Sequence, residues 1–338
     1  MADRIVLHVG PHKTGSTALQ HMFATNRRVL ARYGIHYPIT GLDGAAHQDV
    51  ARACWGKDSS LLLDLANEMA EHDTVFISSE LISALDMKGL ERLRSAFGET
   101  RVEIIYVIRR LPNLLASHWR ELIKHGQKLS FEEYLENAVV DTGRPNLVPP
   151  LPMLHLDRLC RFFGSDTLRI LCYDARNSEV ENYGQDFVDD IFGIGHEDVF
   201  RTKQLNTTAQ DWQVELGRHM NILGNTTLNY PQRLNLRKKL FERIADDMLD
   251  WMPGFAAQYD AAVPITLSDQ TDWIAQEQEA VAQTYGSHFV DPVESYLAPT
   301  EQQIRQLPLG MLSPQLRSDI SFLFNELAAN LDPFPPTG

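Results

Sequence analysis

The chain has 338 residues, enough for one large α/β domain or two small ones with cores of ordinary size. Its contents of 43% apolar and 22% charged residues are typical of a globular protein. The formal net charge of −14 at pH 7 argues against nonspecific binding to nucleic acid or acidic membranes, although a local basic pocket can still hold an anionic ligand.

Apolar, β-branched runs alternate with amphipathic stretches, which is the pattern of βαβ units and of a parallel β-sheet flanked by helices. We predict strands at 4–10, 34–38, 74–80, 102–109 and 167–174. Helices are predicted at 15–32, 59–72, 86–97, 112–126, 152–163, 207–223, 229–251, 267–285 and 313–331. Ser268 and Ser313 are the expected N-caps of the last two. The expected fold is therefore a single domain over 1–338, with an α/β core at about 1–200 and a mainly helical extension at about 201–331.

The three cysteines, Cys54, Cys160 and Cys172, are odd in number and include no closely spaced pair. This argues against a disulfide framework or a CxxC metal site and favours buried thiols in a reducing compartment. The amino-terminal apolar run is too short for a signal peptide, and no later segment has the roughly 18 uncharged apolar residues of a membrane span. We expect a cytoplasmic protein with no integral membrane segment and no nucleic-acid partner.

The first predicted strand leads into the segment "HVGPHKTGSTALQ" at 8–20. Gly10 and Gly15 have the glycine spacing of the nucleotide-triphosphate loop G-x-x-x-x-G-K-[ST], but the only lysine is Lys13, inside the loop. A glycine-rich turn and a helix that begins at Gly15 or Ser16 direct backbone N–H groups and the positive end of the helix dipole at one point. The side-chain donors of this loop are Lys13, Ser16 and Thr17. The segment therefore predicts an anion-binding site.

A second group of donors lies in "IYVIRRLPNLLASHWREL", after the strand predicted at 102–109. The strand ends at Arg109, Pro112 suits the first turn of a helix, and Ser117 follows about a turn further along. An arginine and a serine so placed can both donate to one phosphate. Because the carboxyl ends of parallel strands meet at one edge of a sheet, two anion sites are expected there, which fits a nucleotide with 5′ and 3′ phosphates.

The pair "GPHKTGST" and R-x7-S, Arg109 to Ser117, resembles the 5′-phosphosulfate loop and the 3′-phosphate motif of sulfotransferases that use 3′-phosphoadenosine 5′-phosphosulfate (PAPS). The resemblance includes the order of the motifs, their separation by roughly a hundred residues and their strand-to-helix context, and it covers about residues 4–200. It implies a P-loop-like fold and an enzyme that transfers a sulfuryl group from PAPS to a hydroxyl or amine of an acceptor. The nucleotide product would be 3′-phosphoadenosine 5′-phosphate (PAP), and no metal would be required.

The resemblance also implies roles for individual residues. A lysine at the position of Lys13 contacts the 5′-phosphate and the bridging oxygen, where charge accumulates as the sulfuryl group leaves. Arg201 and Lys203 lie in "RTKQLNTTAQ", which resembles a loop that closes over the 3′-phosphate in related bacterial proteins. The cofactor-binding residues implied in this way are Lys13, Thr14, Gly15, Ser16, Thr17, Arg109, Ser117, Arg201 and Lys203.

An acceptor hydroxyl or amine loses a proton as it attacks, so the site needs a base. Glu80 closes the strand predicted at 74–80 and resembles the glutamate base of carbohydrate-modifying sulfotransferases, although Leu81 replaces the lysine usual there. Cytosolic small-molecule sulfotransferases use a histidine, which leaves His12 and His47 as alternatives. Glu80 favours a carbohydrate acceptor over a small alcohol, a phenol or a lipid, and the helical extension is the expected acceptor side.

Two other functions stay open. A Mg²⁺-dependent P-loop kinase or NTPase would hold its metal at Thr17 and at Asp174, where the Walker-B-like strand "LRILCYD" ends. Against this, the strands expected to flank the loop end in Glu80 and Arg109, and an arginine there repels a metal. A non-enzymatic module that binds PAP would keep both anion sites but would not depend on Glu80. The sequence leaves the oligomeric state open.

Overall fold

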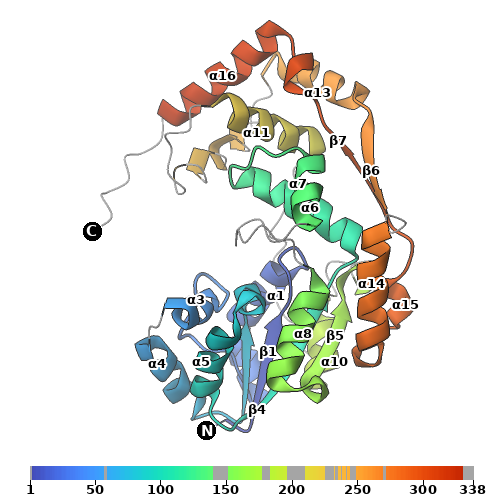
Figure 1. Cartoon of the computed structure of the whole chain (residues 1–338). Coiled ribbons are helices and arrows are strands. Elements are labelled where there is room, and N and C mark those ends of the chain that lie inside the picture. Colours follow the sequence, from blue (N-terminus) through green and yellow to red (C-terminus); the bar gives the residue numbers. More distant parts are fainter. Residues whose placement is uncertain are drawn as a thin grey trace. The chain divides into compact units, whose positions relative to one another are not determined.

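The computed structural model describes residues 2–56, 59–139, 151–176, 183–195, 210–224, 249–268 and 272–329, together with 232, 235–236, 238–240 and 242–243. The chain forms two compact units, and Figure 1 labels most of their helices and strands. Unit 1 comprises Met1–Leu114, Pro150–Asn206 and Asp269–Thr300, and unit 2 comprises Leu115–Pro149, Thr207–Ser268 and Glu301–Gly338. Among the described residues, no helix is long and apolar enough to cross a membrane.

Unit 1 is built on a parallel sheet of five strands in the order β2-β3-β1-β4-β5. The strands are β1 (Arg4–Val9), β2 (Ile35–His36), β3 (Thr74–Ser78), β4 (Arg101–Ile108) and β5 (Leu168–Cys172). The α/β fold class and all five predicted strands are confirmed. Strand β1 lies in the middle, with His8 opposite Ser78 of β3 and Ile105 of β4. The loop that follows β1 therefore begins between the ends of its two neighbours.

Helices cover both faces of this sheet (Figure 1). They are α1 (Ser16–Thr25), α2 (Arg27–Arg32), α3 (Gln48–Gly56), α4 (Ser59–Met69), α5 (Met87–Phe97), α8 (Pro152–Phe163), α9 (Tyr173–Arg176), α10 (Tyr183–Phe192), α14 (Asp272–Tyr285) and α15 (Val293–Tyr296). Short 3-10 turns are η1 (Glu80–Ala84), η2 (Ser165–Thr167) and η3 (Gly286–His288). Helix α6 (Leu111–Lys124) begins in unit 1 and continues in unit 2. The helix predicted at 15–32 is divided at Asn26, whose side chain donates to the Met22 carbonyl at 2.8 Å.

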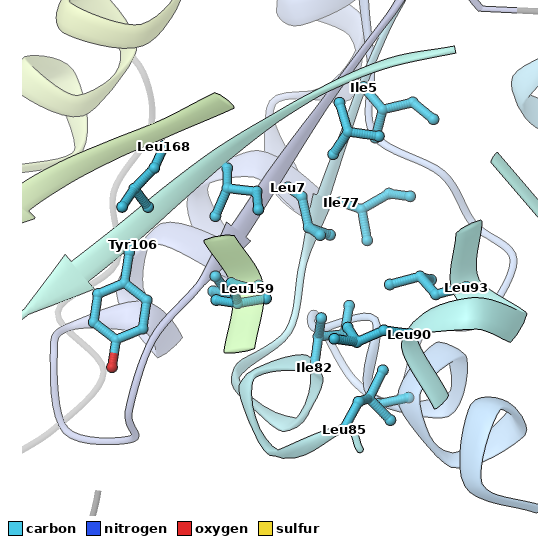
Figure 2. Packing of buried hydrophobic residues seen from close by; sticks show 14 of the residues in the cluster. Ile5, Leu7, Ile77, Ile82, Leu85, Leu90, Leu93, Tyr106, Leu159 and Leu168 are labelled. Atoms are coloured by element: carbon cyan, nitrogen blue, oxygen red, sulfur yellow. The ribbon is translucent and has the colours of Figure 1, made fainter. Parts of the chain in front are cut away.

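The alternation of side chains along the strands divides the core of unit 1 into two layers. On β1, Ile5 and Leu7 pack into one cluster, with residues of α3, α4, α5 and α8. Figure 2 shows part of this cluster. Val6 packs into the other cluster, with residues of α1, α2 and α10. Because both faces are buried, the strands read as nearly continuous apolar runs, which is why they were recognisable in the sequence.

Unit 2 contains the rest of α6, α7 (Phe131–Val139), α11 (Asp211–Leu223), α13 (Met252–Ala261), η4 (Leu309–Met311), α16 (Pro314–Ala329) and an antiparallel pair, β6 (Pro264–Ser268) with β7 (Glu301–Arg305). Apolar side chains of α11, α13 and α16 form a separate core. The predicted helical character of the carboxyl-terminal third is confirmed. Strands β6 and β7 were not predicted, because each has one buried residue, Leu267 and Ile304, and so shows no apolar alternation.

The N-caps predicted for the last two helices had different outcomes. Ser268 is the last residue of β6, opposite Glu301, and residues 269–271, between it and α14, lie outside the described residues, so that cap stays a prediction. The Ser313 hydroxyl accepts a hydrogen bond from the Leu316 N–H at 3.2 Å, so that prediction is confirmed. The helix predicted at 229–251 lies largely outside the described residues.

Candidate functional site

The loop between β1 and α1 has an unusual backbone. Gly10, Lys13 and Gly15 have positive φ angles of 135°, 75° and 76°. Over the part of the chain that the structure describes, Lys13 is the single non-glycine residue with positive φ. A left-handed conformation costs a residue with a side chain roughly 1–2 kcal/mol. Strain of this kind persists where the surroundings hold it, and it is common at functional sites.

The two glycines of the loop are required for close packing as well as for their φ angles. A Cβ atom on Gly10 would lie 2.5 Å from the Val107 carbonyl oxygen on β4. A Cβ atom on Gly15 would lie 2.4 Å from Cε2 of Tyr173, the residue after β5. The glycine spacing in the sequence therefore has a steric basis.

Helix α1 begins at Ser16, with Gly15 as its N-cap, as expected. The N–H groups of Ala18 and Leu19 donate to the Gly15 carbonyl at 3.1 and 3.4 Å. The N–H groups before them belong to the first turn, where a helix offers no internal acceptor. Together with the helix dipole, they make the amino end of α1 suitable for an anion. Thr17 is exposed there.

Two of the side chains expected to bind the cofactor make contacts within the protein. The Thr14 hydroxyl donates to the Pro11 carbonyl at 3.0 Å, and the Thr14 carbonyl accepts from the Tyr183 hydroxyl at 3.3 Å. The Ser16 side chain is buried, and its hydroxyl acts to lower the pKa of the Glu80 carboxyl. A hydroxyl has a single proton to donate. The Thr14 hydroxyl is therefore engaged within the loop, and what Thr14 offers an anion is its backbone N–H group.

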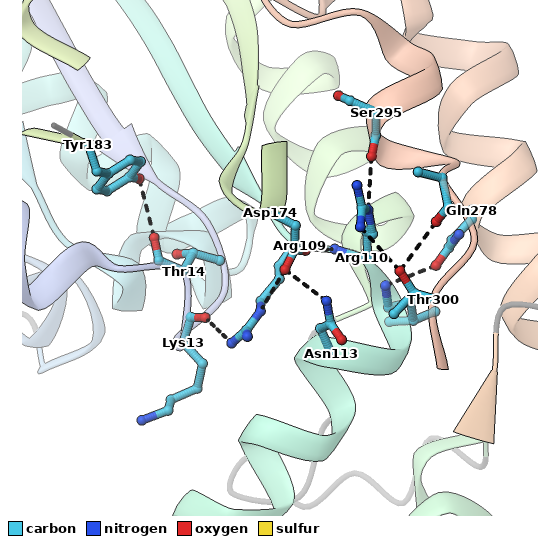
Figure 3. A network of polar contacts seen from close by, with 12 residues as sticks. Lys13, Thr14, Arg109, Arg110, Asn113, Asp174, Tyr183, Gln278, Ser295 and Thr300 are labelled. Carbon is cyan, nitrogen blue, oxygen red and sulfur yellow. Dashed lines mark hydrogen bonds and ion pairs between the residues drawn. The ribbon is translucent and has the colours of Figure 1, made fainter. Parts of the chain in front are cut away.

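Arg109, which follows β4, lies against this loop. Its Nη1 donates to the Lys13 carbonyl oxygen at 2.9 Å, and its guanidinium carbon lies 5.3 Å from the centre of the Tyr173 ring. Figure 3 shows Arg109 between Lys13 and Asp174. The structure thus brings the loop lysine and the strand-end arginine together. This agrees with the sequence prediction, because β1 and β4 are parallel neighbours whose carboxyl ends lie at the same edge of the sheet. The next residue, Arg110, is directed elsewhere, since its Nε donates to the Ser295 carbonyl at 2.9 Å.

Asp174, the metal ligand of the kinase hypothesis, is surrounded by donors. Its Oδ2 accepts from the Arg110 N–H at 2.7 Å, and its Oδ1 accepts from Asn113 Nδ2 at 2.8 Å and lies 3.4 Å from Arg109 Nε. Both oxygens are therefore in use. Within the described ranges, no three His, Cys, Asp or Glu side chains gather in a way that could hold a metal ion. These contacts suit Asp174 to hold an arginine, and they do not favour the kinase.

Glu80 is the second residue after β3, at the start of η1, and is 8% exposed. Its Oε2 accepts from Gln20 Nε2 at 3.1 Å and from Gln48 Nε2 at 2.7 Å. Burial acts to raise the pKa of this carboxyl, but the charge of His12 and the hydrogen bonds from Ser16 and Gln20 outweigh it, and the pKa is lowered from 4.5. Glu80 is therefore ionised at neutral pH and lies beside the loop.

The two histidines considered as bases differ in their surroundings. His12 is exposed on the loop, and its charge acts on Glu80. His47 is fully buried, its Nε2 lies 3.0 Å from the Pro38 carbonyl, and its Nδ1 accepts from the Ser78 N–H at 3.2 Å. Burial lowers the pKa of His47 to about 4. Both ring nitrogens are engaged, so we do not assign His47 as the base.

The positions of the other predicted cofactor ligands relative to this site are not described. Ser117 lies on α6, in the segment grouped with unit 2. Arg201 and Lys203 lie outside the described residues. Residues of the site that the sequence did not single out are Gln20, Gln48, Asn113 and Tyr173. The strand-end rule could have found Tyr173, whereas the two glutamines lie on separate helices and carried no local signal.

No protein-family model matches this chain, and no curated protein sequence matches it significantly. The chain is similar in structure to a sulfotransferase from Alicyclobacillus acidocaldarius. The match covers 75% of this chain and 99% of that chain, with 12% sequence identity and a TM-score of 0.40. Similarity at this level concerns the course of the chain alone.

Proposed function

We propose that this protein is a PAPS-dependent sulfotransferase. The observation that carries the proposal is the contact between the two anion-binding elements, in which Arg109 donates to the carbonyl of the strained residue Lys13 at 2.9 Å. A ligand held at the amino end of α1 that also reaches Arg109 needs two anionic groups a short distance apart. PAPS has them in its 5′-phosphosulfate and its 3′-phosphate.

The residues present suit this ligand. A sulfuryl group carries less negative charge than a phosphoryl group, so fixed donors can stabilise its transfer without a metal. Lys13 acts on the bridging oxygen of the leaving group, and Arg109 holds the 3′-phosphate. The backbone N–H groups that hold the 5′-phosphosulfate are those of Gly15, Ser16 and Thr17. Ser117, Arg201 and Lys203 stay predictions from the sequence.

Titration calorimetry with PAP in EDTA tests the proposal. We expect metal-free binding that weakens about 10- to 100-fold in Arg109→Ala, because a charge-assisted hydrogen bond contributes about 1.5–3 kcal/mol. Arg101, exposed at the opposite end of β4, provides the matched control Arg101→Ala, which should bind normally. Binding of ATP with Mg²⁺ in place of PAP would replace this proposal with the kinase.

Glu80 is the base in this proposal, since it is ionised and the charge of His12 on the loop acts on it. We expect Glu80→Gln to lower kcat with labelled PAPS about 100-fold, the lower end of the effect of a general base, and to leave PAP affinity nearly unchanged. Because the pKa of Glu80 is lowered from 4.5, the wild-type rate should decline only below that pH. Glu68→Gln, at another hydrogen-bonded glutamate, is the control. Normal turnover in Glu80→Gln would transfer the role of base to His12.

For the acceptor we propose a carbohydrate hydroxyl, on the basis of a glutamate at the β3 end. A screen with labelled PAPS would compare sugars with small alcohols, phenols and lipids. Binding of PAP without transfer to any of them would favour a non-enzymatic PAP-binding module.

A further inference from the structure

Arg109 is held from three directions. Its Nη1 donates to the Lys13 carbonyl at 2.9 Å, its Nε lies 3.4 Å from Asp174 Oδ1, and its guanidinium lies over the ring of Tyr173. These two hydrogen bonds use Nε and Nη1, and Nη2 has no hydrogen-bond partner among the described residues. A phosphate can therefore bind to Arg109 without displacing the contacts that orient it.

Asp174 also holds the backbone on which Arg109 stands. Its Oδ2 accepts from the N–H of Arg110 at 2.7 Å, and its Oδ1 accepts from Asn113 at 2.8 Å (Figure 3). One carboxylate at the end of β5 thus joins the Arg109 side chain, the next peptide and the first turn of α6. No other residue that we placed in the site makes all three contacts.

We propose that Asp174 is a positioning residue, which aims Arg109 at the 3′-phosphate and keeps it against the loop that carries Lys13. This inference rests on the proposed function, because it names the ligand group that Arg109 meets. In this role Asp174 strengthens binding of the nucleotide, although its negative charge alone would weaken it.

The sign of the effect separates positioning from simple electrostatics. Asp174 is an anion next to a site for anions, so Coulomb's law alone predicts that its removal strengthens PAP binding. If Asp174 positions Arg109, its removal weakens binding instead. Asparagine has one acceptor oxygen and one donor amide, so it cannot accept both from the Arg110 N–H and from the Arg109 and Asn113 side chains.

The experiment measures the affinity of the full-length protein for PAP and for adenosine 5′-monophosphate (AMP), which lacks the 3′-phosphate. We expect Asp174→Asn to weaken PAP binding about tenfold, or about 1.4 kcal/mol, and AMP binding much less. Asn113→Ala leaves the charge unchanged and should weaken PAP binding in the same direction by a smaller factor. Glu103→Gln is the matched control. Glu103 lies near the opposite end of β4 and also pairs with arginines, and 12% of its side chain is exposed, compared with 10% for Asp174.

Each outcome decides between the possibilities. Unchanged or tighter PAP binding in folded Asp174→Asn, or an equal loss of PAP and AMP affinity, would overturn the positioning role while the proposed function stands. If Asp174→Asn does not fold, Asn113→Ala decides, and equal PAP affinity in that variant and the wild type would overturn the role. A wild-type protein that does not bind PAP would refute the proposed function, and this inference with it.

Discussion

Replacement of Lys13 by alanine is expected to reduce sulfuryl transfer from PAPS by about 100- to 1,000-fold, the usual effect of removing one donor that stabilises charge in a transition state. The bridging oxygen gains negative charge as its bond to sulfur breaks, and the amine of Lys13 is the cationic side chain that the loop itself supplies. PAP affinity should fall much less, because the backbone N–H groups of the loop remain. Turnover with labelled PAPS, beside calorimetry with PAP, checks both.

The backbone strain at Lys13 offers a control for this variant. Alanine at a φ of 75° carries the same left-handed cost as lysine, whereas glycine carries none. Lys13→Gly should therefore be more stable than Lys13→Ala by about 1 kcal/mol and equally inactive. Lys88→Ala, on the exposed side of α5, should be fully active. Transfer at the wild-type rate in Lys13→Ala would remove Lys13 from the reaction.

Gly15→Ala is expected to abolish most PAP binding, with a loss of about 100-fold or more, and to destabilise the protein by about 2–5 kcal/mol. The left-handed conformation costs about 1–2 kcal/mol, and overpacking against Tyr173 adds about 1–3 kcal/mol. Tyr173 has little freedom to move, because it packs edge-on against Tyr183 at 5.4 Å and lies beneath Arg109. The loop must shift instead, and its N–H groups shift with it. Calorimetry and thermal unfolding measure the two effects.

The chain contains a matched control for that substitution. Gly34 has a φ of 72°, close to the 76° of Gly15, but a Cβ atom there would meet nothing within 4 Å. Gly34→Ala therefore carries the conformational cost without the clash, and it should bind PAP normally with a loss of about 1 kcal/mol in stability. Equal behaviour of the two variants would mean that the contact with Tyr173 has no part in forming the site.

The sequence by itself determined the sheet, the place of the site on it and the beginning of α1. The strands are buried on both faces, so their apolar runs are nearly continuous and local signals suffice to find them. Once strands are known, the rule that parallel strands present their carboxyl ends at one edge brings Lys13 and Arg109 together, although 96 residues separate them. The spacing of Gly10 and Gly15 is equally local, since it reflects the turn between one strand and one helix.

Only the tertiary structure decided which side chains are available for chemistry. His47 looked like a possible base until its two ring nitrogens were seen to be engaged by Pro38 and Ser78, and Glu80 turned out to accept from Gln20 and Gln48. Asp174 resembled a metal ligand until its partners were seen 61 to 65 residues away in the chain. Such contacts depend on how separate elements pack, and a pattern of neighbouring residues contains no record of them. For the same reason β6 and β7, which bury one side chain each, were visible only after the chain had folded.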